Sequence, residues 1–249
     1  MQMRMVVSSF LLMRSFTLSS TLSHYKKLAT GHWTWRRKAL RDWNPTLFGD
    51  KMHVKPGVLE LYIGPMKSGK TLAAIHRVEG LNYRDDVDFI FVKPKLDVRE
   101  VGVTSRFGAR QYDPVVADHE HPGCLYELLR PWHRVVVIDE LQFFGEGIVP
   151  VIRQLLVGGM NIIGAGLDTN FRGEPFGYMP HLVGLASEVQ KHTSVCEVAG
   201  CNTDAPLTQR LIDGQPAPYD SPEILVGDAE EGYEPRCIRH HEVPMLEPS

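Results

Sequence analysis

Apolar residues in the middle of the chain form short continuous runs separated by mixed stretches. Runs of strand length occur at Val58–Ile63, Phe89–Val92, Val135–Ile138 and Asn161–Gly166. Helices are predicted over Lys70–Asn82 and Ile148–Val157. Strands that are apolar throughout and alternate with helices indicate a parallel sheet covered on both faces, although a single short apolar run also fits a buried helix. The pattern therefore predicts an α/β fold.

The two ends of the chain differ from this core. Residues 1–41 contain eight basic residues and no acidic one, which is the composition of a transit peptide. A translation start at Met52 or a disordered tail explains the same stretch. After Lys191, periodic segments give way to loops that hold three of the four cysteines. We therefore expect an extension over 1–52, a core over 53–191 and a C-terminal module over 192–249.

Composition narrows the class of protein further. The chain has 249 residues, of which 43% are apolar, and a net charge of −3 that by itself favours neither nucleic acid nor a membrane as partner. Few cysteines in a long chain argue against a secreted disulfide framework. No apolar run approaches the ~20 residues that span a bilayer. We take the cytoplasm as the default location.

The first strand leads directly into a glycine loop that fits the pattern G-x-x-x-x-G-K-[ST]. Such a loop points its backbone N–H groups at phosphate oxygens, and the helix that follows adds partial positive charge. The lysine reaches the β- and γ-phosphates and the hydroxyl ligates Mg²⁺. The residues expected to hold ATP and Mg²⁺ are Gly64, Pro65, Met66, Lys67, Ser68, Gly69, Lys70 and Thr71.

Two carboxylates follow the apolar strand Val135–Ile138. An Asp at such a strand end holds the Mg²⁺ of P-loop enzymes, so Asp139 joins the predicted cofactor site. Glu140 is placed to take a proton from an attacking hydroxyl. A surface pair of carboxylates without a function is the alternative interpretation.

The C-terminal module contains a candidate zinc site of the Cys₃His type. Cys196 and Cys201 form a C-x₄-C pair, and Cys237 and His240 form a C-x-x-H pair. A structural Zn²⁺ would supply folding energy to a small module. His241 is an alternative fourth ligand, although the C-x-x-H spacing favours His240. Unligated residues in a disordered tail are the other interpretation.

Several segments together resemble the zinc-containing thymidine kinase family, and they occur in the family's order over about Val58 to His240. The segments are Gly64-Pro-Met-Lys-Ser-Gly-Lys-Thr71, Lys95-Leu-Asp97-Val-Arg99, Asp139-Glu-Leu-Gln-Phe-Phe144, Gly166-Leu-Asp-Thr-Asn-Phe-Arg-Gly-Glu-Pro-Phe-Gly177, Thr208-Gln-Arg210 and Tyr233. The resemblance implies a RecA-like P-loop core with a small zinc-binding lasso domain. It implies transfer of the γ-phosphate of ATP to the 5′-hydroxyl of thymidine. It also implies a homotetramer and feedback inhibition by thymidine triphosphate.

The resemblance assigns further roles residue by residue. Glu140 matches the general base, and Asp139 matches the carboxylate that holds Mg²⁺ through its waters. Positions around the base match Met66, Phe143, Leu167, Phe171, Phe176 and Thr208. The lasso that closes over the base matches Tyr233 and the backbone at Ile224, Leu225 and Val226. Asp97 and Arg99 match polar groups near the sugar and phosphates. Ordinary core packing is the rival interpretation of the three phenylalanines.

The sequence departs from the family pattern at two places. Lys67 stands where the family often has an aromatic residue or Asn, and nothing in the sequence explains it. The lasso segment Val226–Tyr233 is about one residue longer and lacks a frequent Gly-Gly, which would relax discrimination between thymidine and deoxyuridine.

Two other functions fit part of the pattern. Asp139-Glu-Leu-Gln142 also resembles a helicase acidic motif, which suggests a nucleic-acid-dependent ATPase with a zinc ribbon. A helicase commonly needs two such cores, and without residues 1–41 the chain carries 19 basic against 30 acidic residues, the wrong sign for a phosphate track. A non-catalytic nucleotide-binding relative is the other possibility, against which the intact phosphate loop and acid pair argue.

Overall fold

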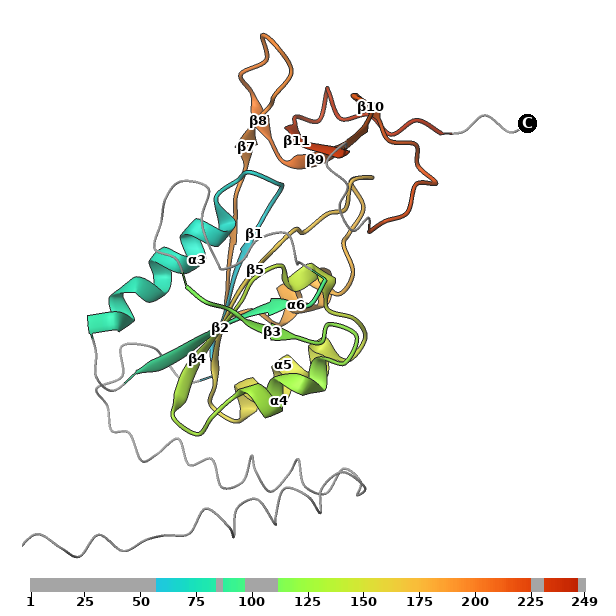
Figure 1. Ribbon diagram of the computed structural model, residues 1–249. Coiled ribbons are helices and arrows are strands. Elements are labelled where there is room, and N and C mark those ends of the chain that lie inside the picture. The colour runs from blue at the N-terminus through green and yellow to red at the C-terminus, as the bar shows by residue number, and fades with distance from the viewer. Residues whose placement is uncertain (1–56, 84–86, 97–111, 225–230, 246–249) are drawn as a thin grey trace, which may run out of the picture. The chain divides into compact units, whose positions relative to one another are not determined.

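The computed structural model describes residues 57–83, 87–96, 112–224 and 231–245. Six strands in this part of the chain form one parallel sheet in the order β3-β2-β4-β5-β1-β6 (Figure 1). Their bounds are β1 Leu59–Ile63, β2 Asp88–Pro94, β3 Val115–Ala117, β4 His133–Ile138, β5 Asn161–Gly166 and β6 Glu188–Lys191. The α/β fold with a parallel sheet is therefore confirmed.

Alternate residues of the central strands belong to two separate apolar clusters. In β4, Val135 and Val137 belong to one cluster and Val136 and Ile138 to the other, as the period of a strand requires. Helix α3, Lys70–Glu79, contributes Ala74, Ile75 and Val78 to the first cluster. Helices α5, Ile148–Val157, and α6, Met179–Leu185, cover the second (Figure 1). Both faces of the sheet are thus buried, which explains why its inner strands are apolar throughout.

The helix that follows the phosphate loop is shorter than predicted. The sequence predicts one helix over Lys70–Asn82, but α3 ends at Glu79 and Gly80–Tyr83 is a separate 3₁₀ turn, η2. Glycine is a poor helix former, and the Asn82 side chain donates a hydrogen bond to the Glu79 carbonyl over 3.2 Å, which ends the α-helical pattern.

The remaining helices of the described residues are short. They are η3 Pro122–Cys124, α4 Leu125–Leu128 and η4 Leu141–Phe143. Within these described ranges, no helix has the length and apolar character that crossing a membrane requires.

The chain beyond the parallel sheet folds into small antiparallel sheets. Strand β7, Ser194–Val195, pairs with β8, Asp204–Ala205. Strand β9, Leu207–Ile212, lies between β10, Gln215–Pro216, and β11, Glu231–Arg236. The sequence analysis did not predict strand β6, because its four residues are all exposed and form no apolar run. The predicted division at residue 192 falls after this strand and stays a prediction.

Candidate active site

The phosphate loop lies between β1 and α3, as the sequence predicts. Gly64 and Gly69 have φ angles of 139° and 82°, so the loop uses backbone conformations that glycine adopts without strain. A Cβ atom at Gly64 would lie 2.3 Å from the carbonyl oxygen of His192, which leaves no space for a side chain. The loop therefore depends on the backbone at residue 192 as well as on its own glycines.

Lys70 and Thr71 begin α3 and face the end of β4. Lys70 is buried, and its Nζ donates to the Pro65 carbonyl over 2.6 Å. Burial lowers the pKa of this lysine, although the nearby carboxylates Glu140, Asp139 and Asp168 oppose the shift. The Lys70 amine therefore lies near carboxylates of opposite charge, at the place in the loop where a phosphate group would also bind.

The Thr71 hydroxyl donates to the carboxylate of Asp139, with distances of 3.1 and 3.3 Å to the two oxygens. Asp139 is buried at the end of β4, and burial together with the charge of Glu140 raises its pKa to about 7. A hydroxyl and a carboxylate at this spacing are oxygen ligands of the kind that Mg²⁺ prefers. A cation there would favour the ionised form of the carboxylate.

Glu140 is held in an uncommon conformation next to this pair. Its φ of 51° places it in the left-handed region, at a cost of about 1–3 kcal/mol for a residue other than glycine. Gln142 Nε2 donates to Glu140 Oε2 over 2.6 Å, and Gln142 Oε1 accepts from the backbone N–H of Leu167 over 3.0 Å. A side chain at Gly166 would collide with that oxygen at 2.6 Å. The Glu140 carboxylate is therefore oriented by the neighbouring strand β5, a role for Gln142 that the sequence analysis missed.

Asp168 is a second residue near the loop that the sequence analysis did not single out. Its Oδ2 lies 2.7 Å from Lys191 Nζ at the end of β6, whereas its Oδ1 is buried without a hydrogen-bond partner. The signal in the sequence was only its place two residues after a predicted strand, where ligands of parallel sheets gather.

The predicted base-binding residues lie around the same end of the sheet. Phe143 and Phe176 meet edge to face with ring centroids 5.8 Å apart. Phe171 lies against the guanidinium of Arg210, 4.1 Å from its ring centroid, and Leu167 is buried. Among the described residues, none of these four belongs to the apolar clusters on the two sheet faces. Leu167, Phe171 and Phe176 are nevertheless buried, so their role in binding a base stays a prediction.

Thr208 and Met66 are in direct contact, although they are far apart in the sequence. The Met66 backbone N–H donates to Thr208 Oγ1 over 3.0 Å, which ties the phosphate loop to β9. The predicted residue Ile224 is exposed at the end of a described range. Leu225, Val226, Asp97 and Arg99 lie outside the described residues.

Arg210 lies between Phe171 and Tyr233 and also bonds the chain just before Ile224. It is fully buried, and its Nε donates to the Tyr233 hydroxyl over 2.9 Å. Its other nitrogens donate to the carbonyl groups of Pro222 and Glu223. One guanidinium thus joins Tyr233 to Pro222 and Glu223, a contact that the sequence analysis did not predict.

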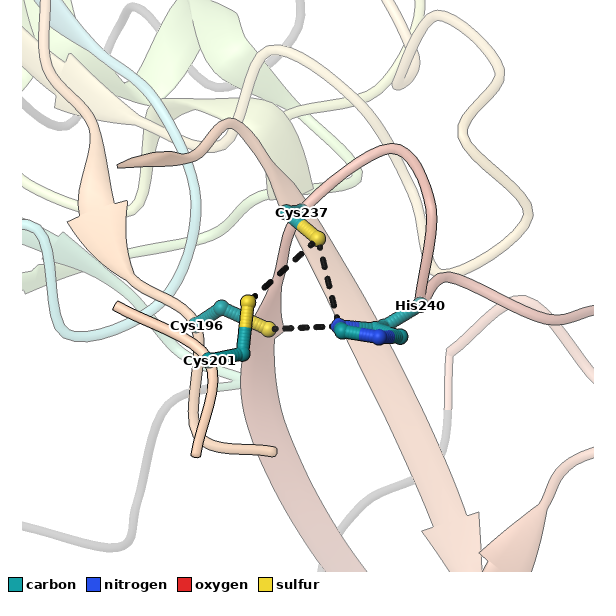
Figure 2. Close-up of side chains that lie close together, drawn as sticks. All are labelled: Cys196, Cys201, Cys237 and His240. Atoms are coloured by element: carbon teal, nitrogen blue, oxygen red, sulfur yellow. Dashed lines mark hydrogen bonds between the residues drawn. The ribbon is translucent and has the colours of Figure 1, made fainter. Parts of the chain in front are cut away.

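The four predicted zinc ligands come together in the C-terminal module (Figure 2). The Sγ atoms of Cys196 and Cys237 lie 3.6 and 3.3 Å from His240 Nδ1, and those of Cys201 and Cys237 lie 3.9 Å apart. Tetrahedral zinc, with Zn–S of about 2.3 Å and Zn–N of about 2.0–2.1 Å, places its ligand atoms roughly 3.5–3.8 Å apart. The cluster therefore fits zinc.

Two further observations agree with a zinc site. Burial would raise the pKa of Cys196, but hydrogen bonds from its neighbours outweigh it and lower that pKa to about 7, which favours the thiolate that binds metals. His241, the alternative ligand, instead lies with Nε2 2.9 Å from the Phe171 carbonyl oxygen.

Comparison with known proteins gives a consistent result. The family model described as "Thymidine kinase" matches residues 57–241. The thymidine kinase of Coprothermobacter proteolyticus is 45% identical over 190 residues, which cover 76% of this chain and 92% of the relative. The thymidine kinase of Mycoplasmoides gallisepticum is 40% identical over 190 residues, or 76% of this chain and 82% of the relative.

Proposed function

The chain belongs to the thymidine kinase family, and on this premise we propose that it transfers the γ-phosphate of ATP to the 5′-hydroxyl of thymidine. The products are thymidine monophosphate and ADP. The observation that carries the proposal is the contact of the Thr71 hydroxyl with Asp139, which brings the phosphate loop and the acid pair of β4 together. The family match does not favour the nucleic-acid-dependent ATPase.

The triphosphate binds in the loop Gly64–Thr71. Backbone N–H groups and the start of α3 receive its oxygens, and the Lys70 amine exchanges the Pro65 carbonyl for the β- and γ-phosphates. Thr71 and Asp139 would hold Mg²⁺, which would supply charge neutralisation for the phosphates.

Glu140 acts as the general base. Its carboxylate accepts the proton of the 5′-hydroxyl as the oxygen of that group forms a bond to the γ-phosphorus. The bond between this phosphorus and the β–γ bridging oxygen breaks, and its electron pair leaves with ADP. Gln142 fixes the direction of the carboxylate through the 2.6 Å hydrogen bond, so the base is aligned before the substrate arrives.

Thymine binds between the phosphate loop and the lasso. The residues proposed around it are Met66, Phe143, Leu167, Phe171, Phe176 and Thr208, with Ile224, Leu225, Val226 and Tyr233 from the lasso. The polar residues Asp97 and Arg99 contact the sugar and phosphates. Aromatic walls suit a flat base, and backbone groups of the lasso can bond the thymine edge.

A structural Zn²⁺ at Cys196, Cys201, Cys237 and His240 stabilises the C-terminal module. From the family we also propose a homotetramer, inhibition by thymidine triphosphate and a cytoplasmic location. Deoxyuridine is the second acceptor that we propose.

The test is phosphate transfer from γ-labelled ATP to thymidine by the full chain with Mg²⁺. We expect labelled thymidine monophosphate from the wild type and loss of product, with ATP binding retained, in Glu140→Gln. Product from the wild type with full turnover in the variant would reject the base assignment. No product from a folded protein that holds zinc and binds ATP would reject thymidine as acceptor.

A further inference from the structure

Lys67 has a strained backbone in the phosphate loop. Its φ is 59°, in the left-handed region that residues other than glycine rarely adopt. Within residues 64–71, all of which the structure describes, the other two positions with positive φ are glycines. A lysine holds this conformation only if its surroundings fix it.

The residues that contact Lys67 belong to the C-terminal module. Its Nζ lies 2.8 Å from both carboxylate oxygens of Glu197, and the two side chains are 33% and 37% exposed. The Ser194 hydroxyl donates to the Lys67 carbonyl over 3.3 Å. Because the Met66 backbone N–H also donates to Thr208 Oγ1, the tip of the loop contacts both ends of the segment that carries two zinc ligands.

Glu197 is itself held in place by the zinc module. It directly follows Cys196, and its backbone N–H donates to the Pro235 carbonyl over 3.1 Å, two residues before Cys237. The N–H of Cys196 donates to the Thr203 carbonyl over 3.1 Å. The position of the carboxylate therefore follows from the fold around the metal ligands.

We propose that Glu197 is a positioning residue that couples the zinc module to the phosphate loop. Its ion pair with Lys67 fixes the loop in the form whose N–H groups receive the ATP triphosphate. The inference deepens the proposed function and rests on it for the identity of the nucleotide. Because coupling between two sites is reciprocal, bound ATP also raises the affinity of the module for zinc.

The opposite effect would follow if Lys67 were a phosphate ligand held back by Glu197. Removing the carboxylate would then release a cation beside the triphosphate and tighten ATP binding. If the ion pair positions the loop, removing either partner weakens binding. The sign of the change therefore separates the two roles.

The experiment measures the dissociation constant of ATP by calorimetry on the full zinc-loaded chain without thymidine, so its outcome is independent of the phosphate acceptor. Glu197→Gln and Lys67→Met each weaken ATP binding about two- to five-fold, the range of a partly exposed ion pair. The double variant is no weaker than either single variant. Glu234→Gln, which breaks the Glu234–Arg236 pair in the same module, leaves ATP binding unchanged.

A glycine at position 67 provides the decisive variant, because glycine adopts positive φ without support. Lys67→Gly therefore binds ATP more tightly than Lys67→Met, and adding Glu197→Gln to it has no further effect. Zinc competition with a chromophoric chelator shows ATP-enhanced zinc affinity in the wild type and none in Lys67→Met. Three results would overturn the proposal. The first is tighter ATP binding by Glu197→Gln, and the second is additive losses of ATP affinity in the double variant. The third is ATP binding by Lys67→Gly that is as weak as that of Lys67→Met. If Glu197→Gln loses zinc, the two Lys67 variants still decide the outcome.

Discussion

Gln142 holds Glu140 through a 2.6 Å hydrogen bond from its side-chain amide to the carboxylate. The other end of the same amide is fixed by the backbone N–H of Leu167, which directly follows strand β5, and Gly166 leaves the space that this arrangement needs. Glu140 also has a left-handed backbone, so two separate features determine where its carboxylate points. This relationship makes Gln142 a positioning residue for the proposed base.

Gln142→Leu tests that relationship. The leucine has a similar size but cannot donate to Glu140, so we expect kcat to fall about 10-fold or more while the dissociation constant of ATP stays unchanged. The measurement is steady-state kinetics with thymidine together with ATP calorimetry. Gln154→Leu on α5 is the matched control, because Gln154 bonds Tyr126 away from the site. Equal losses in both variants would point to a general loss of stability.

Asp139 gives the metal-free protein a specific pH dependence of stability. Its pKa is raised to about 7, so the folded state binds more protons than the unfolded state between pH ~4 and ~7. The free energy of unfolding contributed by this group therefore falls as pH rises through that window. We expect Asp139→Asn to raise the melting temperature more at pH 7.5 than at pH 5.

The measurement for this prediction is thermal unfolding of both proteins at the two pH values, without Mg²⁺. Comparing the variant with the wild type at each pH cancels the pH dependence of zinc binding, which both share. Added Mg²⁺ should stabilise the wild type and not the variant. A melting-temperature difference that is independent of pH would contradict the raised pKa.

The choice of fourth zinc ligand can be tested with adjacent histidines. His240→Ala should lower the zinc content per chain and the melting temperature, because His240 Nδ1 lies within 3.6 Å of two cysteine sulfurs. His241→Ala should keep one zinc per chain, since its ring instead meets the Phe171 carbonyl. Metal analysis by atomic emission after gel filtration gives the result. Full zinc content in His240→Ala would remove this residue from the site.

Arg210 should control thymidine binding through the lasso. Arg210→Met removes the donors to Tyr233, Pro222 and Glu223, so we expect weaker thymidine binding by about 10-fold or more and a lower melting temperature. Tyr233→Phe removes one hydroxyl and should have a smaller effect. Thymidine calorimetry measures both variants, and ATP binding is the internal reference. Equal effects on thymidine and ATP would show that Arg210 acts on overall stability instead.

Parts of the site follow from local sequence, for identifiable reasons. The phosphate loop was predictable because its function requires glycines and a lysine at fixed spacing between a strand and a helix. The acid pair was predictable because it directly follows an apolar run, and the end of such a run indicates the end of a buried strand. Cys196, Cys201, Cys237 and His240 were predictable as a group because metal ligation restricts residue type and spacing.

Contacts between distant segments were decided only by the tertiary structure. Lys67 had no explanation in the sequence because its partner Glu197 lies 130 residues away and neither residue belongs to a periodic pattern. The choice between His240 and His241 depended on which ring the turn after Cys237 directs to the sulfurs. Strand β6 and the roles of Gln142 and Arg210 arise from pairing and hydrogen bonding across the fold. Local spacing specified the reactive groups, whereas contacts between segments distant in the sequence set their orientation, as the Leu167 backbone does for Gln142 and thereby for Glu140.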